Sequence, residues 1–95
     1  YRDFAARGQI EVSTTPFYHP ILPLLCDSDI AGVAHPYVPL PPRFRYPQDA
    51  REQLDRARGY MNQHLHIKPV GLWPSEGSVS DEMLHLAAEG GFRWF

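Results

Sequence analysis

Two glutamates stand where the sequence would place chemistry at the ends of neighbouring strands. Glu11 lies in residues 9–13 (QIEVS), whose alternation of polar and apolar side chains predicts a strand. Glu76 follows residues 70–73 (VGLW), which predict a short buried strand stopped by Pro74. Glycoside hydrolysis uses two carboxylates in one cleft, one attacking or stabilising the oxocarbenium-like carbon and the other moving a proton. With 11 acidic residues in 95, chance pairings are common, and the alternative for Glu11 is an exposed residue on a strand edge.

The surroundings of Glu76 strengthen its case. It lies between Pro74 and Gly77, and we expect it directly before the N-terminus of a helix. Backbone N–H groups and the positive end of the helix dipole would favour an ionised carboxylate there. An ionised carboxylate can act as a nucleophile but not as a resting general acid. The alternative is a glutamate that merely decorates the first turn of that helix.

Two further side chains could contact a substrate. Trp73 could stack on a sugar ring from the loop after its strand, although tryptophan is more often a core residue. His19, between Tyr18 and Pro20, could hydrogen-bond substrate hydroxyls, or its imidazole could hold its own loop in place. Both alternatives stay open from the sequence alone.

Histidine and cysteine do not form a metal-binding pattern. His64 and His66 are two residues apart near a helix end, so they cannot share one helix face. His35 and His85 are scattered, and we expect neither a zinc site nor any cofactor. Cys26, the single cysteine, follows a run of leucine and is expected to be a small buried hydrophobe without a disulfide partner.

The strongest secondary-structure prediction is a helix from about Pro47 to Leu65. Pro47 suits the first helical position, and apolar residues recur at spacings of three and four. A second helix, capped by Ser78 or Ser80, carries an apolar stripe and ends at Gly90. The stripe of the first helix is Ala50, Leu54, Ala57, Met61 and Leu65, and that of the second is Val79, Met83, Leu86 and Ala87.

The order of the expected elements predicts an α/β fold. Residues 1–7 predict a helical end, 36–45 a proline-rich surface connection, and 92–95 a third strand. Helices alternating with strands favour parallel strands joined by right-handed crossovers. We therefore expect part of a (β/α) barrel, whose chemistry sits on the loops after the strands. Because the sequence begins within a helix and ends within a strand, we also expect it to be an internal piece, truncated at both ends.

Composition excludes several classes of function. A chain of 95 residues can bury one modest core, and 9 basic against 11 acidic side chains give a net charge of −2. The absence of a basic run argues against nucleic acid as a partner. The longest apolar stretch, residues 21–26, is too short to span a bilayer, so no membrane partner is expected. The sequence leaves the oligomeric state unknown and the location open, with the cytoplasm as the expectation.

Two longer segments carry a resemblance. Residues 8–25 (GQIEVSTTPFYHPILPLL) and 71–80 (GLWPSEGSVS) resemble glycoside hydrolase family 57, most closely its α-amylase and amylopullulanase branch. The resemblance extends to residues 91–95 (GFRWF), and the WPSEGS run is its most specific part. It implies a catalytic domain folded as a (β/α)7 barrel, with residues 1–95 as a part of it. The implied reaction is retaining cleavage or transfer of α-glucans without a metal.

Site residues follow from the same resemblance. Glu76 matches the catalytic nucleophile, and Glu11 matches a substrate-binding glutamate of the cleft. A His-Gln-Pro segment and a downstream acid/base aspartate, both features of the family, have no match here. We therefore expect the isolated piece to be inactive.

Two rival functions belong to other classes. A non-catalytic carbohydrate- or partner-binding barrel of the same fold would lack the downstream aspartate. A metal-dependent deacetylase on a related barrel would need an Asp and His ligand set, and the sequence offers no such spacing. Neither the choice between hydrolysis and transfer nor the linkage and chain-length preference can be deduced from these residues.

Overall fold

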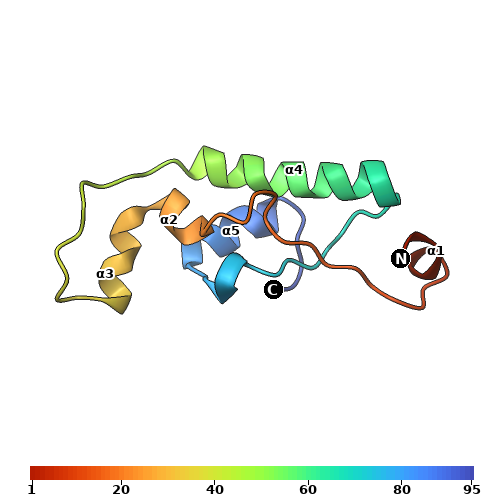
Figure 1. Cartoon of the computed structure of the whole chain (residues 1–95), viewed down its shortest axis with the longest axis horizontal. Coiled ribbons are helices and arrows are strands. Elements are labelled where there is room, and N and C mark those ends of the chain that lie inside the picture. The colour runs from red at the N-terminus through yellow and green to blue at the C-terminus, as the bar shows by residue number, and fades with distance from the viewer.

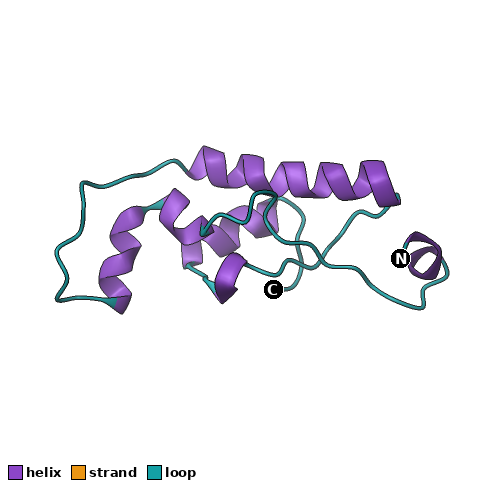
Figure 2. Cartoon of the chain, in the orientation of Figure 1, coloured by secondary structure: helices purple, strands orange, loops and turns teal.

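The computed structural model describes residues 1–95 as five helices joined by long irregular segments. The molecule is elongated, 51 × 20 × 19 Å, and its longest helix runs along the long axis (Figure 1). Figure 2 shows helices and loops but no strand. The helices are α1 (Arg2–Ala6), α2 (Leu22–Cys26), α3 (Ala31–Ala34), α4 (Pro47–Leu65) and α5 (Asp81–Glu89), with 3₁₀ turns at η1 (Ser28–Ile30) and η2 (Ser75–Gly77).

Helix α4 confirms the strongest prediction from the sequence. Pro47 occupies the first turn, and the helix ends at Leu65, after which His66 adopts a left-handed backbone (φ 55°). Its apolar stripe is buried at Ala50, Leu54 and Ala57 and half-buried towards the C-terminal end. An i, i+4 ion pair also lies on the exposed side of α4, where Arg56 Nε donates to Glu52 Oε1 at 2.6 Å.

Helix α5 begins where one of the two expected caps stands. The Ser80 hydroxyl accepts a hydrogen bond from the backbone N–H of Met83 at 3.3 Å. Met83 and Ala87 are fully buried, as their spacing predicts. The inclusion of Val79 in the stripe was wrong, because this residue precedes the cap and leaves 54% of its surface exposed.

The core lies where α2, α4 and α5 meet. Leu54 from α4 is 1% exposed, and Leu72, from the extended segment between α4 and α5, is fully buried beside it. Burying a side chain of this size stabilises the folded state by about 1.5–3 kcal/mol. The cluster consists of Leu22, Cys26, Ala50, Leu54, Leu72, Met83, Ala87 and Phe92.

Three extended segments lie side by side in parallel, joined by single bridges. Thr14 pairs with Leu72, and Gly71 pairs with Trp94, so residues 71–72 form the middle segment. The backbone N–H of Trp73 donates to the Thr14 carbonyl at 2.8 Å, and that of Leu72 donates to the Trp94 carbonyl at 3.0 Å. Both bridges are parallel, as the alternation of helices and strands predicts, but the first one involves Thr14 rather than residues 9–13.

A regular strand over residues 9–13 was a wrong prediction. Pairing starts only at Thr14, whose N–H donates to the Gly71 carbonyl at 3.1 Å. The preceding residues run away from the middle segment towards α1, where the Gln9 N–H donates to the Phe4 carbonyl (Figure 1). A strand needs a neighbouring backbone along its length, and these residues have none.

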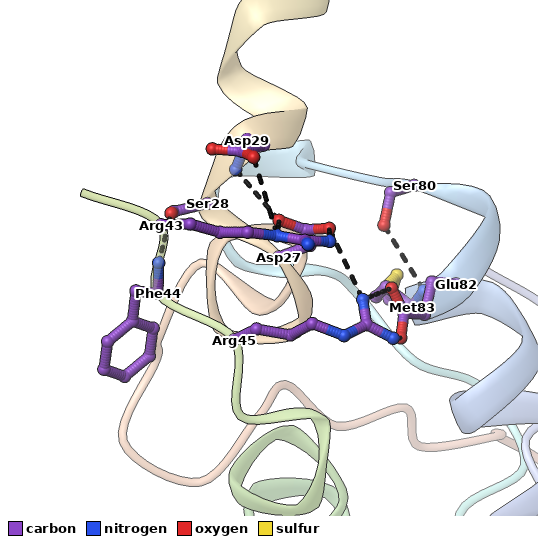
Figure 3. Close-up of polar contacts among 9 residues, drawn as sticks. All are labelled: Asp27, Ser28, Asp29, Arg43, Phe44, Arg45, Ser80, Glu82 and Met83. Carbon is purple, nitrogen blue, oxygen red and sulfur yellow. Dashed lines mark hydrogen bonds and ion pairs between the residues drawn. The ribbon is translucent and has the colours of Figure 1, made fainter. Parts of the chain in front are cut away.

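The proline-rich connection of residues 35–46 is tied down by arginines (Figure 3). Arg43 forms a two-pronged contact with Asp27, and its Nε lies 2.9 Å from Asp27 Oδ1. Arg45 forms a similar fork with Glu82 on α5, at 2.8 and 3.1 Å. These pairs hold an otherwise irregular segment against α2 and α5 and thereby fix where α4 begins.

Candidate functional site

Glu76 occupies an unusual backbone position. It lies in η2 with φ 56° and ψ 20°, the left-handed region, and is followed by Gly77 with φ 68°. A residue with a side chain pays roughly 1–2 kcal/mol to adopt this conformation. The first residue of the turn, Ser75, and the preceding Pro74 are both buried. The glutamate side chain is 72% exposed and projects from a fixed base.

The expected helix N-terminus at Glu76 was wrong. Helix α5 begins at Asp81, four residues after the end of the turn, and Ser80 is its cap. Asp81 and Glu82 occupy its first turn instead. The influence of a helix dipole falls off within one turn, so it does not act on Glu76.

His19 is the second residue in a left-handed backbone, with φ 58°. Its loop follows the bridge at Thr14, and its own N–H donates to the Pro16 carbonyl at 3.0 Å. The loop is anchored on α4 by Gln53, whose backbone carbonyl accepts from the Phe17 N–H at 3.3 Å. The side-chain oxygen of Gln53 accepts from the Tyr18 N–H at 2.8 Å. These contacts fix the backbone of residues 17–19, from which the imidazole projects.

The two left-handed residues meet. His19 Nε2 lies 2.8 Å from Glu76 Oε1, a hydrogen bond across 57 residues of sequence. Their side chains are 51% and 72% exposed, so the pair lies open to solvent. The third non-glycine residue with positive φ, His66, simply ends α4. Strained backbone that is kept at two loops in contact is a recognised mark of functional sites.

Glu11 has a different partner. Its Oε1 accepts a hydrogen bond from the indole Nε1 of Trp94 at 2.8 Å. No hydrogen bond joins Glu11 to Glu76 or to His19. Glu11 precedes the bridge at Thr14, whereas Glu76 follows the bridge at Leu72. The structure therefore brings together Glu76 and His19, and the convergence of the two glutamates stays a prediction.

Trp73 lies on the surface rather than in the core. Its side chain is 61% exposed, whereas the neighbouring Leu72 is fully buried. Its backbone N–H is held by the Thr14 carbonyl. The core alternative for Trp73 was therefore wrong, and its indole is exposed to solvent.

Other groups complete the inventory of reactive side chains. Cys26 is buried, and burial, with Glu82 as the second cause, raises the pKa of its thiol to about 11. The residues contain no group of three or more His, Cys, Asp or Glu side chains arranged to hold a metal ion. None of the helices combines the length and apolar character needed to cross a bilayer.

A cavity of about 420 Å³ lies between the His19 loop and α4, lined in part by Tyr18 and Tyr60.

Sequence reasoning missed Trp94 as a partner of Glu11. Pattern analysis assigned residues 92–95 to a strand by their aromatic content, without a role for individual side chains. Gly71 was a usable signal, since a glycine inside a predicted strand often marks the close approach of another group. Here the Trp94 ring lies across it.

A family model described as glycosyl hydrolase family 57 matches residues 1–95. No curated protein and no solved structure matches the chain. The family model confirms the resemblance carried by the GQIEV and WPSEGS segments. Because the match runs from the first residue to the last, the chain belongs to glycosyl hydrolase family 57, a family of glycoside hydrolases and transglycosylases that act on carbohydrates.

Proposed function

We propose that this chain supplies the nucleophile of a retaining enzyme that cleaves or transfers α-glucans, in the manner of α-amylases and amylopullulanases. Glu76 is the nucleophile in this proposal, and His19, Glu11 and Trp73 bind substrate. Family membership supports a carbohydrate substrate. The single observation that carries the proposal for the site is the hydrogen bond between His19 and Glu76, two residues whose backbones are both left-handed.

The geometry of Glu76 suits a nucleophile. A carboxylate that attacks carbon must be accessible from one side and fixed in direction, because misplacement by about 1 Å can cost a hundredfold in rate. Glu76 is exposed, its backbone is set by Pro74 and Gly77, and one of its oxygens is engaged by His19. The other oxygen has no hydrogen-bond partner in the chain and is free to approach a sugar.

The proposed reaction has two displacements. A Glu76 oxygen bonds to the anomeric carbon while the glycosidic C–O bond breaks, and the departing oxygen takes a proton from an acid/base carboxylic acid. Water or a sugar hydroxyl then attacks the same carbon, releases Glu76 and returns a proton to the acid/base group. The proposal assigns the acid/base role to an aspartate outside residues 1–95. Two inversions at one carbon leave its α configuration retained.

The remaining candidates would hold the sugar. An exposed indole such as Trp73 can stack on a pyranose face, and this side chain lies at the end of the segment that leads to Glu76. While His19 Nε2 donates to Glu76, its Nδ1 could accept a hydrogen bond from a hydroxyl, since a neutral imidazole has one donor and one acceptor nitrogen. Glu11 would accept hydrogen bonds from hydroxyls with its second carboxylate oxygen.

We further propose that residues 1–95 form part of a (β/α)7 barrel. Two parallel bridges support this arrangement, one between Thr14 and Leu72 and one between Gly71 and Trp94. The helices that lie between these segments in the sequence support it as well. Both His19 and Glu76 follow the bridges in chain direction, as expected for loops at the carboxyl ends of barrel strands.

Substitution of Glu76 by glutamine tests the proposal in the enzyme. Glu76→Gln removes the nucleophile with little change in shape, so turnover of maltooligosaccharides should fall by about 10³-fold or more while glucan binding persists. Glu52→Gln is the matched control, because Glu52 is an exposed glutamate on α4 that pairs with Arg56. Product analysis by NMR should show the α anomer first. Near-normal turnover of Glu76→Gln, or an inverted product, would overturn the assignment, and binding without turnover in the unaltered enzyme would favour a non-catalytic barrel.

A further inference from the structure

The indole of Trp94 crosses the middle segment of the three parallel ones. Trp94 pairs with Gly71 through a parallel bridge, and Gly71 lies between the segments of Trp94 and Thr14. A Cβ atom added to Gly71 would overlap the Cζ2, Cε2 and Cη2 atoms of the Trp94 ring. The ring therefore occupies the space in which any other residue at position 71 would place its side chain.

This crossing brings the indole nitrogen to Glu11. Adjacent extended segments lie about 4.8 Å apart, so two spacings separate the outer segments by roughly 10 Å. The Trp94 ring covers one spacing by lying over Gly71, and the Glu11 side chain reaches the indole nitrogen from the residues just before the bridge at Thr14. The result is the 2.8 Å hydrogen bond from Trp94 Nε1 to Glu11 Oε1. Gly71 makes the contact possible by having no side chain.

Glu11 has little else to fix it. The backbone of residues 9–13 belongs to no strand, and the Glu11 residue is exposed. The Trp94 indole provides the one hydrogen bond that its carboxylate makes. A carboxylate free to rotate would bind a sugar hydroxyl weakly, because ordering it costs entropy on binding. A donor that holds one oxygen orients the other before substrate arrives.

We propose that Trp94 is a positioning residue for Glu11, with Gly71 as the residue that admits its ring. The inference rests on the proposed function, in which Glu11 binds substrate, and deepens it by naming the group that orients this glutamate. Trp94 itself does not touch the sugar. It acts on binding rather than on the bond-breaking step.

The kinetic test is a double-mutant cycle in the enzyme with maltooligosaccharides. Trp94→Phe keeps a ring over Gly71 but removes the N–H, so KM should rise about tenfold while kcat changes less than about twofold. On a Glu11→Ala background the same substitution should change KM less than about twofold, since no carboxylate is left to orient. Gly71→Ala should raise KM as Trp94→Phe does, by displacing the ring. Phe95→Leu, an aromatic truncation in the same segment, is the control and should leave both parameters unchanged.

A spectroscopic arm tests the contact without activity. The indole N–H resonance of Trp94, assigned by its loss in Trp94→Phe, should shift when Glu11 is replaced by alanine, whereas that of Trp73 should not. An unmoved Trp94 resonance overturns the positioning role, and so does an equal rise in KM on both backgrounds. If Glu11→Ala leaves KM unchanged although the resonance moves, the contact exists but the substrate role of Glu11 fails, and the inference fails with it.

Discussion

Replacing His19 by glycine and by alanine separates its backbone strain from its contact with Glu76. With φ 58°, the left-handed backbone of His19 destabilises the fold by roughly 1–2 kcal/mol, and alanine at this position would be strained equally. Glycine adopts this region without strain. It also raises the conformational entropy of the unfolded chain, which lowers the free energy of unfolding by about 0.4–1 kcal/mol. The two terms together should make His19→Gly more stable than His19→Ala by roughly 0.5–1 kcal/mol, the reverse of the order at an ordinary position.

Both variants lose the hydrogen bond to Glu76. The side chains are 51% and 72% exposed, so solvent screening limits the loss of stability to about 0.2–1 kcal/mol. His19→Ala should therefore be slightly less stable than the natural protein, and His19→Gly about equal to it.

The activity of the two variants should not follow their stability. Without its partner the Glu76 carboxylate is free to rotate, and kcat/KM should fall about 10- to 100-fold in both variants.

Urea denaturation and steady-state kinetics on the same preparations test these expectations. Comparison of midpoints at an unchanged m-value gives the difference in the free energy of unfolding. A His19→Gly variant clearly less stable than His19→Ala would contradict the left-handed backbone at this residue. Full activity in either variant would show that the contact with Glu76 does not serve the reaction.

Three further predictions concern the scaffold. The hydrogen bond from the Arg43 side chain is the main cause that lowers the pKa of the Asp27 carboxyl from 3.8 to about 2. The ionised Asp27 therefore stabilises the fold above pH 3.8, and this stabilisation is lost as the pH falls through about 2. Asp27→Asn should therefore unfold at lower urea than the natural protein at pH 7, with the two midpoints becoming equal only below about pH 2. Because burial raises the pKa of Cys26 to about 11, its thiol should resist alkylation at pH 8 until urea unfolds the chain, and prompt labelling would contradict the burial. Leu54→Ala, at a side chain 1% exposed, should cost about 2.7–5 kcal/mol in the free energy of unfolding, and a loss below 1 kcal/mol would show that α4 does not pack as described.

The helices could be predicted because their signals are local. Pro47, the stripe through Leu54 and the cap at Ser80 each lie within a few residues of the structure they determine. Parallel pairing was also accessible, since alternating helices and strands leave few other topologies. The extent of pairing was not, because residues 9–13 look like a strand locally but meet no neighbouring backbone before Thr14.

The candidate site shows the same division. Chemistry and resemblance marked Glu76 and His19, but their contact depends on two left-handed turns that residue patterns do not reveal outside glycine. Helix dipole reasoning misplaced the support of Glu76, since the sequence does not say whether Ser78 or Ser80 caps α5. Trp94 escaped notice because its role depends on a ring that lies over Gly71 from a segment 23 residues further along the sequence.

Identification of the residue that becomes covalently bound to the sugar tests the central claim most directly. A fluorinated α-glucosyl fluoride that forms the glycosyl-enzyme quickly and releases it slowly should accumulate the intermediate, because its leaving group is good and its fluorine slows the second displacement. Digestion and mass spectrometry should then find the sugar on the peptide that contains Glu76, attached to that side chain. A sugar attached to Glu11 or to any other carboxylate, or release of an inverted product without an intermediate, would contradict the assignment of Glu76 as the nucleophile.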